Sequence, residues 1–351
     1  MQSAHVNPTP RLGGVGIVLA VVTGFVLLGD PSDSFWLALL VSLAPVFLAG
    51  LFEDLGFYIS PRGRLLAALV SGIILLATQQ IWITAIGVPG VDALFAFAPF
   101  AIVVTLIWST GMCHAFNLID GVNGFAGATG VVIGAGLALV SWWVGDTQML
   151  ALCGTVIAAL IGFQLHNWPK GRIFLGDGGA YSVGHLLVWL GIALVARNPE
   201  VAGISIALFY FWPVADTLWA IYRRRRSGRR TDQPDRMHFH QLVMRTLEIK
   251  FGLRGKRHIS NSLTSFVLTP FVGVPIALGV LFYRAPLLGL AAMVALSVAF
   301  VFMYLRIVGL VSYGRKSEEV APEIVEEPQT VDEPEIAAVV AKEDSHRYAA
   351  E

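Results

Sequence analysis

Residues 35–52 read FWLALLVSLAPVFLAGLF and are followed directly by Glu53 and Asp54. The run has no charged side chain, and a helix rises about 1.5 Å per residue against a hydrocarbon layer of about 30 Å. Backbone groups in lipid must be satisfied within their own segment, so the run predicts a membrane-spanning helix. The two carboxylates at its end are costly at a membrane boundary unless they bind something.

The whole chain repeats this pattern. Of its 351 residues, 56% are hydrophobic and 14% are charged, against about 25% charged in an average soluble domain. The apolar residues fall in blocks of the same length, which predicts an all-α integral membrane protein that crosses the bilayer about ten times. The predicted spans are 12–29, 35–52, 65–83, 94–113, 124–144, 149–168, 178–196, 201–222, 263–283 and 286–312.

Positive charge is concentrated in alternate loops. Of the 24 Lys and Arg residues, 12 lie in the loop 223–262, and Lys and Arg in short loops mark the cytoplasmic side. This orientation places both termini in the cytoplasm. Further basic residues in loops of the same side are Arg62, Arg64, Lys170 and Arg172, whereas the opposite loops carry Arg197 and Arg284.

The chain divides by composition into a membrane domain, residues 1–316, and a tail, residues 317–351. The tail holds 11 of the 24 acidic residues, three prolines and a single aromatic residue, Tyr348. Such a composition predicts a disordered cytoplasmic segment. The two cysteines, Cys113 and Cys153, fall in or beside apolar spans without metal-ligand spacing, which favours a role as small buried hydrophobes.

The unusual polar residues gather in the loops assigned to the cytoplasm. The first is HVNPTPRLGG, residues 5–14, which by itself is typical of a helix entry. The second is the pair Glu53 and Asp54, for which ion pairing with Arg62 or Arg64 is the structural alternative to ligand binding. The third is NLIDGVNG, residues 117–124, whose oxygen-bearing side chains share one face if they form a helical turn.

Two further loops complete the set. HNWPKGRIFLGDGGA, residues 166–180, places Asp177 before two glycines, either as a helix N-cap or as a ligand for a magnesium ion that holds a diphosphate. The basic loop runs RRRRSGRRTDQPDRMHFHQL, in which Arg236, His238 and His240 offer donors to phosphate oxygens. Together these loops predict a magnesium diphosphate site at the membrane face, with a lipid as one substrate.

The motifs occur in the order and spacing of a known family. NPTPRLGG, Glu53-Asp54, NLIDGVNG, HNWPKGRIFLGDGG, Pro213 with Asp216-Thr217, and DRMHFHQ resemble the polyprenyl-phosphate N-acetylhexosamine-1-phosphate transferases, glycosyltransferase family 4. The resemblance covers residues 5–312. It implies a UDP-amino sugar donor such as UDP-GlcNAc, an undecaprenyl phosphate acceptor and UMP as product, at the start of cell-surface polysaccharide, O-antigen or teichoic-acid synthesis. It implies no nucleic-acid partner and leaves room for a homodimer.

The resemblance also implies residue roles. Asp177 and Asn117 match positions at the magnesium, for which manganese is an alternative. The candidate catalytic carboxylates are Asp54, with Glu53 as its neighbouring alternative, and Asp120. The candidate substrate-binding residues are Asn123 and Asn167 near the uridine, and Arg236, His238 and His240 near the phosphates. The chain departs from the usual family pattern at Glu53, His114, Asn123 and Gln241.

Two other classes of protein fit parts of the pattern. Buried polar residues and broken helices also mark transporters, and Asp216 inside a predicted span keeps that alternative open. A membrane scaffold would explain the acidic tail but gives no reason for NLIDGVNG or Asp177. The concentration of polar groups on one face favours the transferase.

The charge distribution makes a prediction about topology. A cysteine introduced next to Asp54, Asp120, Asp177 or His238 should be shielded in intact cells from a membrane-impermeant thiol reagent, whereas one next to Asp146 should react. Labelling of the first group from outside the cell would overturn the placement of the site.

Overall fold

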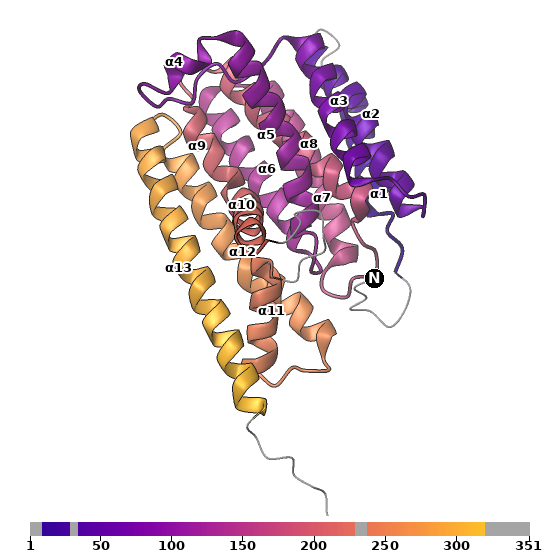
Figure 1. Ribbon diagram of the computed structural model, residues 1–351. Helices are drawn as coiled ribbons and strands as arrows, with labels where there is room; N and C mark the ends of the chain where they lie inside the picture. The colour runs from indigo at the N-terminus through magenta and orange to yellow at the C-terminus, as the bar shows by residue number, and fades with distance from the viewer. Residues whose placement is uncertain (1–8, 29–33, 229–236, 320–351) are drawn as a thin grey trace, which may run out of the picture. The chain divides into compact units, whose positions relative to one another are not determined.

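The computed structural model describes residues 9–28, 34–228 and 237–319, with side chains through residue 312. This part of the chain is helical and contains no strand (Figure 1). The helices are α1 (Gly13–Leu28), α2 (Ser34–Asp54), α3 (Pro61–Gln79), α4 (Asp92–Phe95), α5 (Ala98–Ile119), α6 (Phe125–Val144), α7 (Thr147–Asn167), α8 (Gly176–Arg197), α9 (Gly203–Ala207), the 3-10 turn η1 (Leu208–Tyr210), α10 (Phe211–Arg226), α11 (Phe239–Lys250), α12 (Arg257–Leu281) and α13 (Pro286–Glu319).

Each of the ten predicted spans corresponds to a helical segment. Within the described residues, nine segments are long and apolar enough to cross a membrane, and α9, η1 and α10 together form one of them. The first predicted span is the apolar helix α1, which is shorter, with 16 residues. The prediction of an all-α, multi-pass membrane protein is therefore confirmed.

Several span boundaries differ from the prediction by a few residues, and two of these differences affect the site. Helix α3 begins at Pro61 rather than at residue 65, because Ser60 accepts the N–H of Gly63 at 3.1 Å and proline suits the first helical position. Helix α5 continues to Ile119 rather than ending at residue 113. Asn117 consequently lies in the last turn of a spanning helix, not in a loop.

The eighth span and the basic loop are also more structured than predicted. The span is interrupted by η1, where Pro213 has no N–H to donate to the carbonyl of Phe209. The loop predicted at 223–262 contains the end of α10, the whole of α11 and the start of α12. Most of the predicted tail, residues 320–351, and the segment 229–236 lie outside the described residues.

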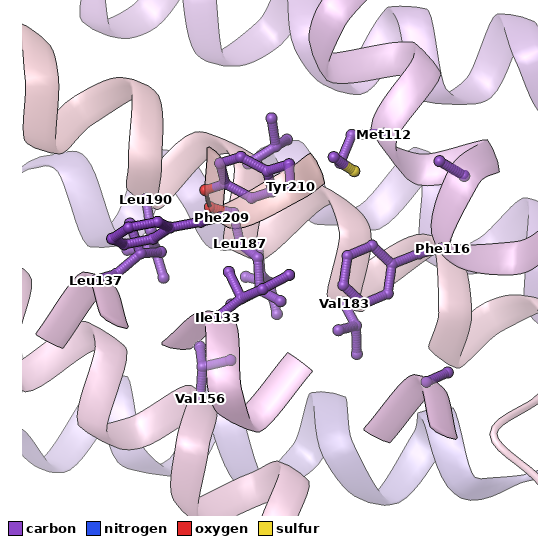
Figure 2. Packing of buried hydrophobic residues seen from close by; sticks show 14 of the residues in the cluster. Met112, Phe116, Ile133, Leu137, Val156, Val183, Leu187, Leu190, Phe209 and Tyr210 are labelled. Atoms are coloured by element: carbon purple, nitrogen blue, oxygen red, sulfur yellow. Dashed lines mark hydrogen bonds between the residues drawn. The ribbon is translucent and has the colours of Figure 1, made fainter. Parts of the chain in front are cut away.

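Helix α8 lies at the centre of the helical packing. Every residue from Gly176 to Leu194 is buried, and the helix packs against α1, α2, α5, α6 and α7. The Tyr210 hydroxyl donates a hydrogen bond of 2.7 Å to the carbonyl of Leu187, which fastens the eighth span to α8. Figure 2 shows residues of this core: Met112, Phe116, Ile133, Leu137, Val156, Val183, Leu187, Leu190, Phe209 and Tyr210.

Glycines bring two other helices against the backbone of α8. A Cβ atom on Gly14 of α1 would overlap the backbone of Gly179, and one on Gly50 of α2 would overlap that of Gly178. Side chains larger than hydrogen at these crossings would push the helices apart. The glycine pair that follows Asp177 therefore serves helix packing, in line with the use of small residues in membrane helix contacts.

The segment before α1 pairs with the segment before α8. The N–H of Phe174 donates to the carbonyl of Pro10, the N–H of Gly13 to that of Phe174, and the N–H of Gly14 to that of Leu175, all at 2.9 Å. The motif PTPRLGG is thus more than a helix entry, because its backbone holds the chain that leads into Asp177.

The glycine contact makes a prediction about stability. Gly50→Ala should lower the melting temperature of the detergent-solubilised protein clearly, because the new methyl group meets the backbone of Gly178. Gly154→Ala is the matched control: it adds the same group within α7, where a Cβ meets nothing within 4 Å. Alanine in a helix is favoured over glycine by roughly 0.5–1 kcal/mol, so the control should melt at the same or a higher temperature. Equal melting temperatures for the two variants would contradict the close approach of α2 and α8.

Candidate functional site

The predicted grouping of the polar loops is confirmed by their contacts. Asp54 at the end of α2, Asn117 at the end of α5 and Asp177 at the start of α8 meet at one end of the helices. The ion pair between Arg197 and Asp146, 3.1 Å long, lies on loops of the opposite end. Which end faces the cytoplasm stays a prediction from the charge distribution.

Asp54 caps the N-terminus of α8 from another helix. Its Oδ1 accepts the N–H of Asp177 at 2.9 Å, and its Oδ2 accepts the N–H of Gly178 at 2.8 Å. Its side chain is 2% exposed, and its nearest cation is Arg11, at 3.9 Å. Because the free N–H groups at a helix start attract a carboxylate, this contact fixes where α2 meets α8.

Glu53 faces a different part of the chain. Its carboxylate accepts the N–H of Ile59 at 2.7 Å and so holds the turn between α2 and α3. Among the described side chains, neither Glu53 nor Asp54 forms an ion pair with Arg62 or Arg64, so that structural alternative is wrong. The two adjacent carboxylates have separate positioning roles because they leave the end of α2 in different directions.

Asp177 is buried and engages both of its oxygens. Oδ1 accepts a hydrogen bond of 3.1 Å from the Asn117 amide, and Oδ2 accepts one of 2.6 Å from Nη1 of Arg64. Asp177 lies inside the first turn of α8, which begins at Gly176. The alternative that it caps this helix is therefore wrong, because the caps come from Asp54.

Asp120 is the C-cap of α5 and is half-buried beside these carboxylates. Burial raises the pKa of its carboxyl to about 7, Arg11 opposes that rise, and the charges of Asp177 and Asp54 add to it. The Asp120 carboxyl makes no hydrogen bond to any described residue, and only its backbone N–H does, to the carbonyl of Asn117 at 3.3 Å. Its carboxyl is thus free to meet a ligand and keeps its proton in a large fraction of molecules near neutral pH.

Asn123 and Asn167 hold the neighbouring loops together. The N–H of Asn123 donates to Oδ1 of Asn261 at 2.6 Å. Oδ1 of Asn167 accepts the N–H of Gly124, and its amide nitrogen donates to the carbonyl of Ile173 at 2.7 Å. Both ends of the Asn167 amide are therefore used within the protein. Contact of these residues with a uridine stays a prediction.

The histidine motif is held by a residue from the broken eighth span. Nδ1 of His238 lies 3.0 Å from Oδ2 of Asp216, and Oδ1 of Asp216 accepts the N–H of Phe239 at 3.0 Å. Asp216 is 2% exposed. The buried carboxylate that kept the transporter alternative open is therefore accounted for as the support of the motif. Arg236, a predicted phosphate ligand, lies outside the described residues.

His240 lies against the loop that follows α5 and so brings the histidine motif next to Asp120. Its ring is 1% exposed, and neither of its nitrogens has a partner among the described residues. Burial lowers its pKa to about 4, with Asp216 opposing, so the ring is neutral at pH 7 and offers one donor and one acceptor. A Cβ on Gly121 would overlap Nε2 of His240. The glycine therefore lets the loop after α5 approach the histidine.

Three residues of the site were not assigned from the sequence. Arg64 was interpreted through its loop charge and as a possible ion-pair partner of Glu53 or Asp54. Arg11 was part of a turn motif, and Asp216 was part of a family motif and a possible transporter feature. The signal for Arg64 and Asp216 was a charged side chain at the edge of, or within, an apolar span, where charge is costly without a partner. The sequence did not indicate which partner each one meets.

The oxygen atoms near Asp177 fit a magnesium ion chemically. Magnesium takes one or two protein carboxylates and completes its shell with water and phosphate oxygens. The Asp177 carboxylate and the Asn117 amide lie in contact and supply such oxygens. No three His, Cys, Asp or Glu side chains of the described residues are grouped to hold a metal by themselves, so this fit requires substrate oxygens.

Comparisons with known proteins agree with this arrangement. The model of glycosyl transferase family 4 matches residues 36–195. A Bacillus subtilis protein, a probable undecaprenyl-phosphate N-acetylglucosaminyl 1-phosphate transferase, is 27% identical over 69% of this chain and 68% of its own length. The undecaprenyl-phosphate alpha-N-acetylglucosaminyl 1-phosphate transferases of Escherichia coli K12 and Yersinia pestis are 25% and 26% identical over 70% of this chain, and over 67% and 68% of their own lengths. The matched motifs, the spanning helices that carry them and these relatives together make the chain similar to the proteins of glycosyl transferase family 4.

Proposed function

We propose that the protein transfers N-acetylhexosamine-1-phosphate from a UDP-amino sugar, with UDP-GlcNAc as the favoured donor, to undecaprenyl phosphate. UMP is released, and the sugar remains on a lipid diphosphate that begins a cell-surface polysaccharide. The observation that carries the proposal is the convergence of Asp177, Asn117, Asp120 and Arg64 at the ends of spanning helices, in a chain whose relatives are named for this reaction.

The place of the site suits a lipid acceptor. Its residues lie at the ends of α2, α5 and α8, where a phosphate at the bilayer surface can meet them while its hydrocarbon tail stays among lipids. The proposed location is the cytoplasmic face of a bacterial inner membrane, where Lys and Arg are concentrated in the loops. A soluble UDP-sugar would reach the site from the water side.

The bond changes define what the site must do. An oxygen of the lipid phosphate attacks the sugar-side phosphorus of the donor, and the bond between that phosphorus and the oxygen leading to UMP breaks. The electron pair leaves with UMP. Both reactants are anionic, so positioning and charge neutralisation supply most of the catalysis. Arg11 and Arg64 are the cations nearest the carboxylates Asp54 and Asp177.

Asp177 and Asn117 would hold a divalent cation, magnesium or manganese, together with diphosphate oxygens. Such an ion, when bound, supplies Lewis-acid stabilisation of the leaving phosphate. Asp54 serves this group by fixing the start of α8, since its two oxygens are occupied by the N–H groups of Asp177 and Gly178. We therefore assign Asp54 to positioning rather than to proton abstraction.

Asp120 is suited to meet a phosphate in its neutral form. A protonated carboxyl donates an O–H hydrogen bond to a phosphate oxygen, whereas the ionised form repels it. Neutral His240 offers a second donor from the other half of the site, and Gly121 leaves room for that approach. These two groups bind the anionic reactants without adding negative charge.

The proposed reaction is tested by product formation. Purified protein in lipid nanodiscs, given UDP-GlcNAc and magnesium, should release UMP only when undecaprenyl phosphate is added. Asp177→Asn should lower turnover by at least about 100-fold, the size typical for loss of a group that stabilises transition-state charge. Asp92→Asn is the control, because Asp92 bonds the N–H groups of Ile86 and Gly87 away from the site. Near-normal turnover of Asp177→Asn would contradict the assignment of Asp177 as a metal ligand.

The role of Asp120 is tested by pH. Its carboxyl ionises as the pH rises through about 7, so the wild-type KM for undecaprenyl phosphate should increase between pH 6.5 and 8.5. In Asp120→Asn the amide keeps its donor at every pH, and this increase should disappear.

Asp54→Asn supplies the comparison for this pH test. It should lose activity to the same extent at pH 6.5 and 8.5, because a lost helix cap does not depend on substrate protonation. If instead Asp120→Asn shows its largest deficit above pH 7, Asp120 acts as a base and the donor role is wrong.

A further inference from the structure

Arg64 forms an ion pair with Asp177, the carboxylate proposed to hold the metal ion. Its Nη1 lies 2.6 Å from Oδ2 of Asp177, and the two side chains are 21% and 12% exposed. The Asn117 amide covers the other oxygen. Asp177 is therefore satisfied by the protein alone, through one charge-assisted and one ordinary hydrogen bond.

The guanidinium is incompletely satisfied in this position. Nε of Arg64 is buried and has no partner among the described residues. Nε2 of His114, one turn before Asn117 on α5, is also buried without such a partner. The His114 ring lies edge-on against Tyr181, with 5.1 Å between ring centroids. A buried donor without a partner is destabilising, so a guanidinium that finds further acceptors elsewhere loses little on leaving Asp177.

We propose that Arg64 is a displaceable counter-ion of Asp177. Arg64 pairs with the carboxylate when no cation is bound, and it yields that oxygen when a divalent cation and the donor diphosphate bind. The guanidinium then pairs with phosphate oxygens, which satisfy several of its donors at once. The inference rests on the proposed function for the identity of the diphosphate, but the competition at Asp177 does not.

The ion pair between Arg64 and Asp177 has a physical effect when no cation is bound. An uncompensated buried carboxylate is destabilising, and Arg64 removes that cost while holding Asp177 in one orientation. The same pair weakens binding of a bare cation, so that cation and diphosphate bind together. A permanent ion pair that only fastens α3 to α8 would leave cation binding unaffected or, once broken, would weaken it through loss of order.

Cation binding without any nucleotide separates these two roles. Mn²⁺ titrated into the substrate-free protein and followed by electron paramagnetic resonance should bind Arg64→Gln about tenfold or more tightly than wild type, since a charge-assisted hydrogen bond contributes about 1.5–3 kcal/mol and 1.4 kcal/mol is tenfold. Arg62→Gln removes the same charge from an exposed neighbour in the same helical turn and should leave the affinity unchanged. Adding Asp177→Asn to Arg64→Gln should abolish the gain.

Two results would overturn the inference. One is an unchanged or weaker Mn²⁺ affinity in a folded Arg64→Gln protein, judged by its melting temperature. The other is an equal gain in Arg62→Gln, which would show a general charge effect. If Arg64→Gln does not fold, Arg64→Lys, which keeps the charge but loses the planar donor pair, must bind Mn²⁺ more tightly than wild type for the inference to stand. Absence of lipid-dependent UMP release in wild type would refute the proposed function without altering these cation measurements.

Discussion

The carboxylate of Asp54 at the N-terminus of α8 is the contact on which the site depends. It accepts hydrogen bonds from the N–H groups of Asp177 and Gly178, which have no partner within their own helix. Helix α8 is buried among the other spans from Gly176 to Leu194. The contact is short enough only because Gly50 and Gly178 let the backbones of α2 and α8 touch. Once these two helices are in contact, the backbone of Asp177 is fixed and only its side-chain rotamer can vary.

The rest of the site is built on that junction in two halves. The acidic half combines Asp177 with Asn117 and Arg64, and its ligands are hard oxygens and a guanidinium. The other half is the neutral ring of His240, supported by Asp216 through the adjacent His238. Such support by hydrogen bonds from residues behind the reacting groups is what keeps a site in one geometry.

Membrane burial explains why each charged group of the site has a protein partner. A carboxylate at the edge of a bilayer is costly when alone, and Asp54, Asp177 and Asp216 each accept at least two hydrogen bonds or one ion pair. Asp120 is different, since its carboxyl makes no hydrogen bond to a described residue and burial raises the pKa of that carboxyl. A group left in this condition is a place where a ligand, rather than the protein, completes the interaction.

The sequence by itself determined the class of fold, because apolar runs of about 20 residues have one outcome in a bilayer: a helix that satisfies its own backbone. It also determined which loops share an end, since spans alternate in direction and the motifs fall at every second turn. It did not determine the partners within that end. Ion pairing with Arg62 or Arg64 was one alternative for Asp54. Asp54 instead meets the backbone of α8, 123 residues away, and Arg64 meets Asp177. Which side chains meet depends on how closely two helices cross, and glycines such as Gly50 permit a close crossing. A crossing depends on the surfaces of both helices, so it cannot be predicted from either stretch of sequence alone.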